Sequence, residues 1–138
     1  QKMSKSLDNH IELTSPEEDT RSRVLTAFTD PQRLRRTDPG RPWMCNVYAL
    51  HKLFNPNKLD EVYQKCTSAE IGCVDDKGLL AEGINKTLEP FRERRRGLVE
   101  KPGYVQDVLH DGASRARIIA RETLAEVRDK MGIAEAAL

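Results

Sequence analysis

The chain has 138 residues, which is enough for one sizeable hydrophobic core. Hydrophobic residues make up 38% and charged residues 33%, and the formal net charge is only +1, so we expect a modest core under a heavily charged surface. There is no run of about eighteen apolar residues, so no membrane span is expected, and no signal peptide is expected ahead of the first charged residue.

Residues 1–14 show no helical or strand periodicity and are expected to form an extended loop. The first residue is Gln1 rather than Met, so we expect a piece of a longer protein that holds its functional site only in part. Residues 2–6 read KMSKS, two lysines and two serines around a methionine. Mobile ammonium groups and hydroxyls suit a phosphate chain whose geometry changes during a reaction. On composition alone, a disordered terminus that contains lysines would be the better explanation.

The first helix is predicted to begin at the sequence SPEE, where Ser15 is placed to cap it and Glu18 completes a capping box. Asp30-Pro31 is expected to mark its end. The stretch 30–43 holds three prolines, a glycine and several arginines, so it is predicted to be a loop.

Apolar residues keep a helical spacing through the rest of the chain. Further helical segments are predicted over residues 47–54, 59–66, 76–91, 105–109 and 113–131. Asp75 or Asp76 is expected to cap the third of them, Pro90 to bend or break it, and Gly132 to end the last. No alternating strand pattern occurs, so the predicted fold is all-α.

Two arginine-rich stretches are candidate nucleic-acid surfaces. They contain Arg33, Arg35 and Arg36 in the predicted loop, and Arg92, Arg94, Arg95 and Arg96 at the end of the long helix. Unpaired RNA bases stack on aromatic or guanidinium planes, while phosphates attract cations. The alternative is an ordinary solvated face or, for the second stretch, a helix end stabilised by cations. Trp43, the single tryptophan, is expected to pack in the core, with a stacking platform as the alternative.

The string KMSKS is letter for letter a signature of class I aminoacyl-tRNA synthetases. The resemblance extends over nearly the whole chain: KMSKSLDN, GLLAEGINKTLEPFRERR and VLHDGASRARIIARETLAEVRDKMG resemble the C-terminal half of bacterial tryptophanyl-tRNA synthetases, with the tyrosyl-tRNA synthetases as the nearest sibling family. The resemblance implies a KMSKS loop and connection over 1–14 and a helical anticodon-binding domain over 15–138. The Rossmann catalytic domain would be missing upstream.

The resemblance also implies an activity: tryptophan is activated with ATP and Mg²⁺, pyrophosphate is released, and tryptophan is transferred to tRNA(Trp). Carried over by position, the phosphate-binding residues are Lys2, Met3, Ser4, Lys5, Ser6 and Asn9. Lys5 would be the main contact to the reacting phosphates, with Lys2 assisting, so these two are the predicted catalytic residues. Asn9 is expected to order the loop.

The second class I signature, a HIGH-type motif, is missing from the sequence. His10-Ile11 matches it for two letters only and follows KMSKS, which is the wrong order. His10 is therefore expected to be an exposed loop residue. This piece alone is expected to be inactive.

Cys45, Cys66 and Cys73 resemble part of a four-cysteine iron–sulfur pattern found in some bacterial tryptophanyl-tRNA synthetases. Asp76 stands where the fourth cysteine would be, and thiolates are the usual cluster ligands. The two alternatives are a cluster with one labile iron and a remnant whose cysteines are small apolar residues. We favour the remnant and predict no metal site.

The sequence therefore predicts a part of a cytoplasmic tryptophan–tRNA ligase that works on tRNA(Trp), as a homodimer at full length and without a membrane. The alternatives are a stand-alone helical module that binds RNA or protein, an iron–sulfur sensor, and the tyrosyl sibling. The sequence that precedes Gln1 would distinguish the stand-alone module from the ligase. The iron content of the purified protein would test the iron–sulfur sensor.

Overall fold

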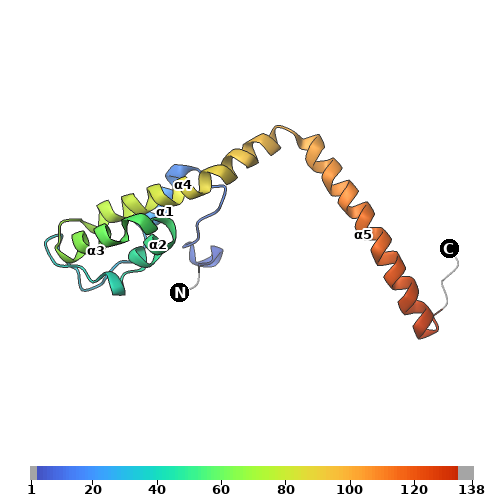
Figure 1. Cartoon of the computed structure of the whole chain (residues 1–138), viewed down its shortest axis with the longest axis horizontal. Helices are drawn as coiled ribbons and strands as arrows, with labels where there is room; N and C mark the ends of the chain where they lie inside the picture. The colour runs from blue at the N-terminus through green and yellow to red at the C-terminus, as the bar shows by residue number, and fades with distance from the viewer. Residues whose placement is uncertain (1–2, 134–138) are drawn as a thin grey trace. The chain divides into compact units, whose positions relative to one another are not determined.

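The computed structural model describes residues 3–133. Gln1, Lys2 and residues 134–138 lie outside the described residues, so the prediction that Lys2 is catalytic falls outside them as well. The chain forms two compact units, one up to Arg95 and one from Arg96 onward (Figure 1). The predicted functional boundary between residues 14 and 15 stays a prediction.

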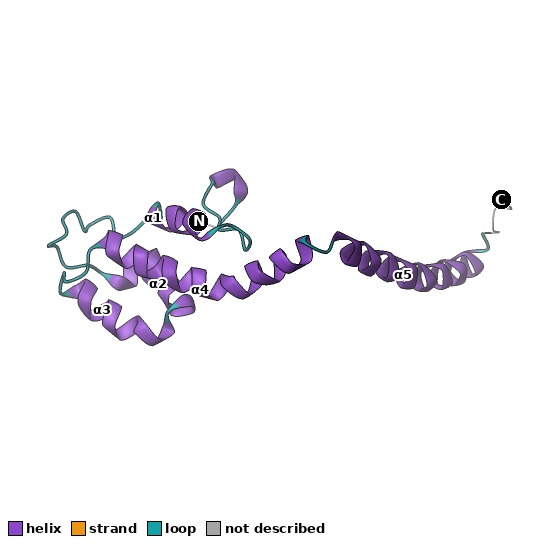
Figure 2. Cartoon of the chain, turned by 90° about the horizontal axis from the view of Figure 1, so that it is seen from above, coloured by secondary structure: helices purple, strands orange, loops and turns teal. Residues whose placement is uncertain are grey.

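Helices and connecting loops make up residues 3–133, with no strand among them, which confirms the predicted all-α fold (Figure 2). The α-helices are α1 (Glu17–Leu25), α2 (Asn46–Phe54), α3 (Leu59–Thr67), α4 (Cys73–Val99) and α5 (Pro102–Met131). Three short 3₁₀ helices are η1 (Lys5–Leu7), η2 (Pro42–Met44) and η3 (Pro56–Lys58). The two short helices predicted around Asn55-Pro56 are confirmed as α2 and α3.

Helix α1 begins one residue later than the capping box requires. Pro16 occupies the capping position without a side-chain hydrogen bond, and the Ser15 amide donates to the Glu12 carbonyl oxygen at 3.2 Å. The predicted cap at Ser15 is therefore wrong. Instead, three acidic residues in the first turn, Glu17 to Asp19, stabilise the positive end of the helix dipole.

The hydrophobic core of the first unit lies where α1, α2 and α4 meet. It consists of Val24, Val47, Leu80, Ala81, Ile84 and Leu88, each at most 5% exposed. Ile11, Ala27, Cys45, Leu50 and Phe54 pack against this cluster from its edges. Burial of these side chains is the main stabilising contribution to the unit.

A buried polar network crosses this core from α2 to α4. The Asn55 amide nitrogen Nδ2 donates to the Leu79 carbonyl oxygen at 3.1 Å and lies 3.0 Å from His51 Nδ1. Because Nδ2 can only donate, His51 Nδ1 is the acceptor and its proton sits on Nε2, which is 3.1 Å from Asp76 Oδ1. His51 is fully buried, and both ring nitrogens are satisfied.

Helix α4 differs from the sequence-based expectations in two ways. Helix α4 already begins at Cys73, and the Asp76 amide donates to the Gly72 carbonyl oxygen at 2.9 Å, so neither Asp75 nor Asp76 caps it. Asp76 is instead buried against His51. Helix α4 also runs through Pro90 without a break. Pro90 is exposed, and the buried Leu88 and Arg92 beside it hold the helix in place across the missing hydrogen bond.

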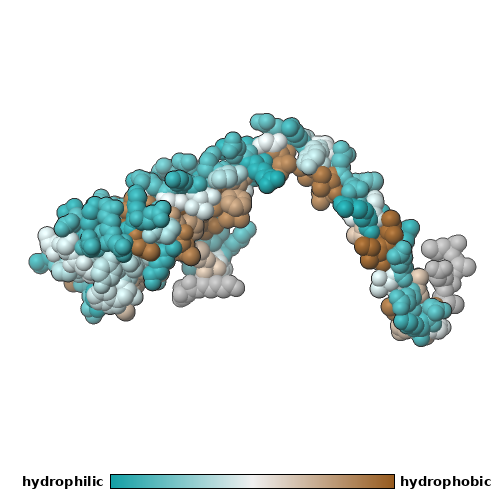
Figure 3. All heavy atoms as spheres, in the orientation of Figure 1, coloured by the Kyte–Doolittle hydropathy of each residue, from teal (hydrophilic) through white to brown (hydrophobic). Residues whose placement is uncertain are grey.

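Helix α5 belongs to the second unit and is longer than predicted, because the turn over 105–109 and the helix over 113–131 form one element. Gly132 ends it with φ 66°, as predicted. No residue of α5 is buried, and its apolar side chains reach the surface (Figure 3). Within residues 3–133, neither α5 nor any other helix is long and apolar enough to cross a membrane.

The arginine-containing loop between α1 and α2 is held by a partly buried ion pair. Arg41 Nε and Nη2 lie 2.8 Å and 2.5 Å from the two carboxylate oxygens of Asp30, and the Gln32 amide donates to Oδ1 at 3.0 Å. In the same loop, the Gly40 amide donates to the Cys66 carbonyl oxygen at 2.9 Å. The loop is thereby fixed to α3.

The Asp30–Arg41 pair predicts a pH dependence of stability. Hydrogen bonds from Arg41 lower the pKa of Asp30 from 3.8 to about 2. A carboxylate with a lowered pKa stabilises the fold above pH 3.8, and this contribution is lost as the pH falls from 3.8 towards 2. We therefore expect urea denaturation to show Asp30→Asn less stable than the wild type by a constant amount above pH 4, with the difference shrinking at lower pH. A difference that stays constant from about pH 4 to 2 would contradict the assignment.

Candidate functional site

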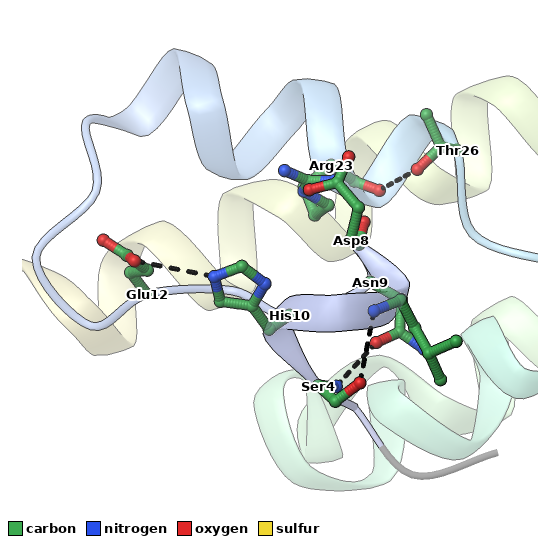
Figure 4. A network of polar contacts seen from close by, with 8 residues as sticks. Ser4, Asp8, Asn9, His10, Glu12, Arg23 and Thr26 are labelled. Carbon is green, nitrogen blue, oxygen red and sulfur yellow. Dashed lines mark hydrogen bonds and ion pairs between the residues drawn. The ribbon is translucent and has the colours of Figure 1, made fainter.

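The described residues of the KMSKS motif lie together in one compact turn around η1 (Figure 4). The Ser4 amide donates to Asn9 Oδ1 at 2.8 Å, and the Leu7 amide donates to Ser4 Oγ at 3.3 Å. The hydroxyls of Ser4 and Ser6 lie 3.1 Å apart. Asn9 thus closes the turn.

Lys5 extends from this turn into solvent, with 84% of its side chain exposed. Its Nζ lies 4.0 Å from Glu12 Oε1, which is the limit of an ion pair. An exposed ammonium group with such a loose partner is available to an anion such as a polyphosphate. Met3 and Asn9 also line a groove of about 690 Å³ together with Val24 and Leu50.

Asp8 connects this turn to α1. Its backbone adopts the left-handed conformation with φ 50°, which Asp tolerates better than most residues. Arg23 Nη1 donates to the Asp8 carbonyl oxygen and lies 2.8 Å from Asp8 Oδ2. The hydrogen bond from Arg23 lowers the pKa of Asp8, and the same contact raises the pKa of Arg23.

His10 follows the motif and is partly buried rather than exposed, so that prediction is wrong. Its Nε2 lies 3.5 Å from Glu12 Oε1, and its buried Nδ1 has no hydrogen-bond partner among the described residues. Both side chains line a cavity of about 420 Å³ next to α1, together with Asp19, Thr20 and Arg23. The sequence offered no signal for this cavity.

The arginines of the first candidate nucleic-acid surface do not all face solvent. Arg33 points inward: its Nη2 donates to the carbonyl oxygens of Arg36 and Ile71 at 3.0 and 2.7 Å, and its Nη1 lies 3.6 Å from Cys66 Sγ. Arg35 and Arg36 are exposed, and Arg36 Nη2 lies 3.9 Å from Asp75. Arg33 therefore holds the loop together, and the two exposed arginines remain candidates.

The four arginines near the end of α4 also differ in whether they are buried or exposed. Arg92 is only 5% exposed, and its Nη2 donates to Thr20 Oγ1 and Asn85 Oδ1, both at 2.9 Å. A guanidinium buried between α1 and α4 cannot reach an anticodon base from this position, so Arg92 does not belong to the candidate surface. Arg94, Arg95 and Arg96 are exposed and stay candidates.

Trp43 is 65% exposed, so the prediction that it packs in the core is wrong. It belongs to a group of aromatic side chains on η2, α2 and α3. Its ring centroid is 6.5 Å from that of Tyr63, which is 6.0 Å from that of Tyr48. Lys52 Nζ lies 5.7 Å from the Tyr48 ring centroid. We call Trp43, Tyr48 and Tyr63 the aromatic platform.

Beyond the effect of burial, Cys45, Cys73 and Asp76 all lie near enough to Cys66 to raise the pKa of its thiol, and the predicted absence of a metal site stays a prediction. In residues 3–133, no three His, Cys, Asp or Glu side chains are arranged to hold a metal ion. The Asp76 carboxylate contacts His51, and the Arg33 guanidinium lies against Cys66 Sγ. Burial raises the pKa of the Cys66 thiol, and the nearby Arg33 guanidinium opposes this shift.

A comparison with known families identifies the class of protein. Residues 1–89 match the family model described as tRNA synthetases class I (W and Y). The match covers most of the first unit, so the chain belongs to the class I tRNA synthetases of this family.

Individual relatives of this chain within the family are tryptophan–tRNA ligases. The chain is 46% identical over 132 residues to the tryptophan–tRNA ligase of Deinococcus radiodurans, covering 95% of this chain and 40% of that protein. It is 37% identical over 134 residues to the tryptophan–tRNA ligase of Aquifex aeolicus, covering 96% of this chain and 34% of that protein. The predicted resemblance to tryptophanyl-tRNA synthetases is therefore confirmed.

A solved structure gives the same result. Tryptophanyl-tRNA synthetase from Campylobacter jejuni, complexed with ADP and tryptophan, matches with a TM-score of 0.83 and 30% identity. The match covers 95% of this chain and 41% of that chain. This chain thus spans well under half the length of its relatives. The tyrosyl sibling, the stand-alone module and the iron–sulfur sensor gain no support from these relatives.

Proposed function

We propose that this chain is the part of a tryptophan–tRNA ligase that supplies the KMSKS loop and the helices next to it. The observation that carries the proposal is the compact KMSKS turn, with Lys5 exposed, in a chain that matches tryptophan–tRNA ligases over 95% of its length. The full-length protein would activate tryptophan with ATP and transfer it to tRNA(Trp).

Lys5 is the residue of this chain to which we assign phosphate binding. Charge develops on the phosphate oxygens as pyrophosphate leaves, and a positioned ammonium group stabilises that charge. Ser4 and Ser6 would donate hydroxyl hydrogen bonds to the same group. Mg²⁺ would be held mainly by the ATP phosphates.

The experiment that tests this proposal is tryptophan-dependent exchange between pyrophosphate and ATP. The full-length protein containing this segment should catalyse the exchange with tryptophan and not with tyrosine. The 138-residue chain alone should not, because its sequence has no HIGH-type motif. Exchange that depends on tyrosine, or no exchange with any amino acid, would contradict the proposal. The cytoplasmic location and homodimeric state belong to the same proposal and are tested by fractionation and by sedimentation.

For tRNA we favour contacts by the aromatic platform and, independently, by the exposed arginines. Trp43 is 65% exposed, and a single-stranded base needs an accessible aromatic ring for stacking. Arg35 and Arg36 precede it in the same loop and can attract phosphates. Arg94, Arg95 and Arg96 on α4 are separate candidates for contacts with phosphates.

Trp43→Ala is expected to weaken tRNA(Trp) binding to the full-length protein by roughly five- to a hundredfold, because stacking of a base contributes about 1–3 kcal/mol. Leu34→Ala is the matched control: Leu34 is 85% exposed in the same loop but has no ring face. A filter-binding titration at fixed salt would measure both. An equal effect of the two substitutions would exclude Trp43 as a stacking residue.

A further inference from the structure

The KMSKS turn is held internally by short-range contacts that do not fix its place on the protein. The bonds from the Ser4 and Leu7 amides stay within residues 4–9. The Asp8 amide closes the 3₁₀ turn by donating to the Lys5 carbonyl oxygen at 3.1 Å. These bonds define the shape of the turn. Its position must come from contacts with another element.

Arg23 of α1 makes such a contact. Its Nη1 contacts Asp8 at two atoms, the backbone carbonyl oxygen and the carboxylate Oδ2 (Figure 4). It therefore holds both the main chain and the side chain of this residue. Asp8 is the left-handed residue where the chain leaves η1, and its amide is bonded to the Lys5 carbonyl. A single hydrogen bond therefore separates the Arg23–Asp8 contact from the backbone of the reactive lysine.

Arg23 lies on helix α1, which is itself held firmly against α4. Thr20 and Val24, which flank it on α1, are 1% and 2% exposed. Helix α1 is fastened to α4 at three points along its length: Asn85 Nδ2 donates to the Glu17 carbonyl oxygen at 3.2 Å, Arg92 Nη2 to Thr20 Oγ1 at 2.9 Å, and Lys77 Nζ to the Leu25 carbonyl oxygen at 2.9 Å. The guanidinium of Arg23 thus reaches the loop from a helix that cannot easily shift.

The position of the Lys5 side chain depends mainly on the position of its backbone, because the side chain makes few contacts of its own. It is 84% exposed, and Glu12 is at the 4.0 Å limit of an ion pair. Where the ammonium group meets a phosphate is therefore decided by the position of the turn. An error of about 1 Å in the position of a catalytic group can lower a rate by about a hundredfold.

We propose that Arg23 is a positioning residue of the KMSKS loop, which holds Asp8 and thereby sets the place of Lys5 against the phosphates. This inference rests on the proposed function. Arg23 acts through Asp8, and its Nη1 is already engaged there. An ion pair between partly exposed groups adds little to global stability, so the effect should appear in the reaction rather than in unfolding.

Arg23→Gln in the full-length protein should lower kcat for tryptophan activation by roughly ten- to a hundredfold, with KM for tryptophan unchanged. Asp8→Asn keeps the carbonyl contact and should cause a smaller loss, and the double variant should be no worse than Arg23→Gln alone. Arg21→Gln on the same helix is the matched control, because Arg21 is exposed and makes no contact with Asp8. It should keep the kcat of the wild type.

Hydrogen exchange of the amides of residues 4–9 supplies a readout that does not need activity. Arg23→Gln should speed exchange of the Leu7 and Asp8 amides, while Arg21→Gln and the melting temperature of both variants should stay near the wild type. Unchanged exchange and unchanged kcat in Arg23→Gln would overturn the inference. So would a fall in melting temperature that accounts for the loss of activity.

The two proposals fail in distinguishable ways. A wild-type protein that does not activate tryptophan, or a Lys5→Ala variant with full activity, would contradict the proposed function, while the exchange measurement would still decide whether Arg23 holds the loop. Full activity of Arg23→Gln beside an inactive Lys5→Ala would reject the role of Arg23 alone.

Discussion

Replacing Lys5 by alanine in the full-length protein is expected to slow tryptophan activation by roughly a hundred- to a thousandfold, the usual cost of removing one group that stabilises transition-state charge. Affinity for tRNA(Trp) should change little, because the proposed RNA surface uses other residues. The measurement is single-turnover formation of tryptophanyl-adenylate at saturating ATP. Since Lys5 is 84% exposed, its loss should leave the fold intact.

Lys86→Ala provides the control for charge. Lys86 is an exposed lysine on α4, and its removal changes the net charge by the same amount without touching the KMSKS turn. We expect normal adenylate formation from this variant. Equal losses of activation and of tRNA binding in Lys5→Ala would contradict the role assigned to Lys5.

Gly83→Ala is expected to have the largest effect on stability, a loss of about 3 kcal/mol from steric overlap and broken hydrogen bonds together. A methyl group at this position would lie 2.2 Å from Asn55 Oδ1 and 2.6 Å from its Nδ2. Asn55 would have to move, and its contacts with His51 Nδ1 and the Leu79 carbonyl oxygen would be lost. Urea denaturation followed by circular dichroism measures the change.

Gly78→Ala is the matched control on the same helix. Gly78 is also buried, but the nearest atom to an added methyl group would be Arg21 Nη2 at 3.8 Å, an ordinary contact. Alanine is favoured over glycine inside a helix by up to about 1 kcal/mol, so this variant should be neutral or more stable. Similar losses from both substitutions would show that the Asn55 network is not the cause.

The elements that the sequence predicted well are those set by local signals. Helical spacing located α2 and α3, Asn55-Pro56 separated them, and Gly132 ended α5. The KMSKS turn was identified from its letters, and Asn9 from the family pattern; the structure shows that Asn9 closes the turn through the Ser4 amide. In each case the determining residues lie within a few positions of one another.

The misjudged features depend on contacts between distant parts of the chain. Pro90 lies within a continuous helix because α4 is packed on both sides of it. Arg92 turned inward because Thr20, seventy-two positions earlier, accepts its hydrogen bond. Trp43 is exposed on η2, whereas the residues that meet in the core come from α1, α2 and α4. The role of Arg23 was missed for the same reason: nothing near it in the sequence points to Asp8.

The burial of Arg92 has a consequence for how substitutions in the string FRERRR are interpreted. The four arginines look equivalent in the sequence, yet one of them fastens α1 to α4 while its neighbours face solvent. A scan that replaces each in turn would therefore mix two phenotypes, a loosened helix pair at Arg92 and an altered surface charge at the others. Among natural variants, Arg92 should tolerate substitution as poorly as core residues do. The substitutions tolerated at Arg94 and Arg95 should instead depend on the chemistry of what these residues bind.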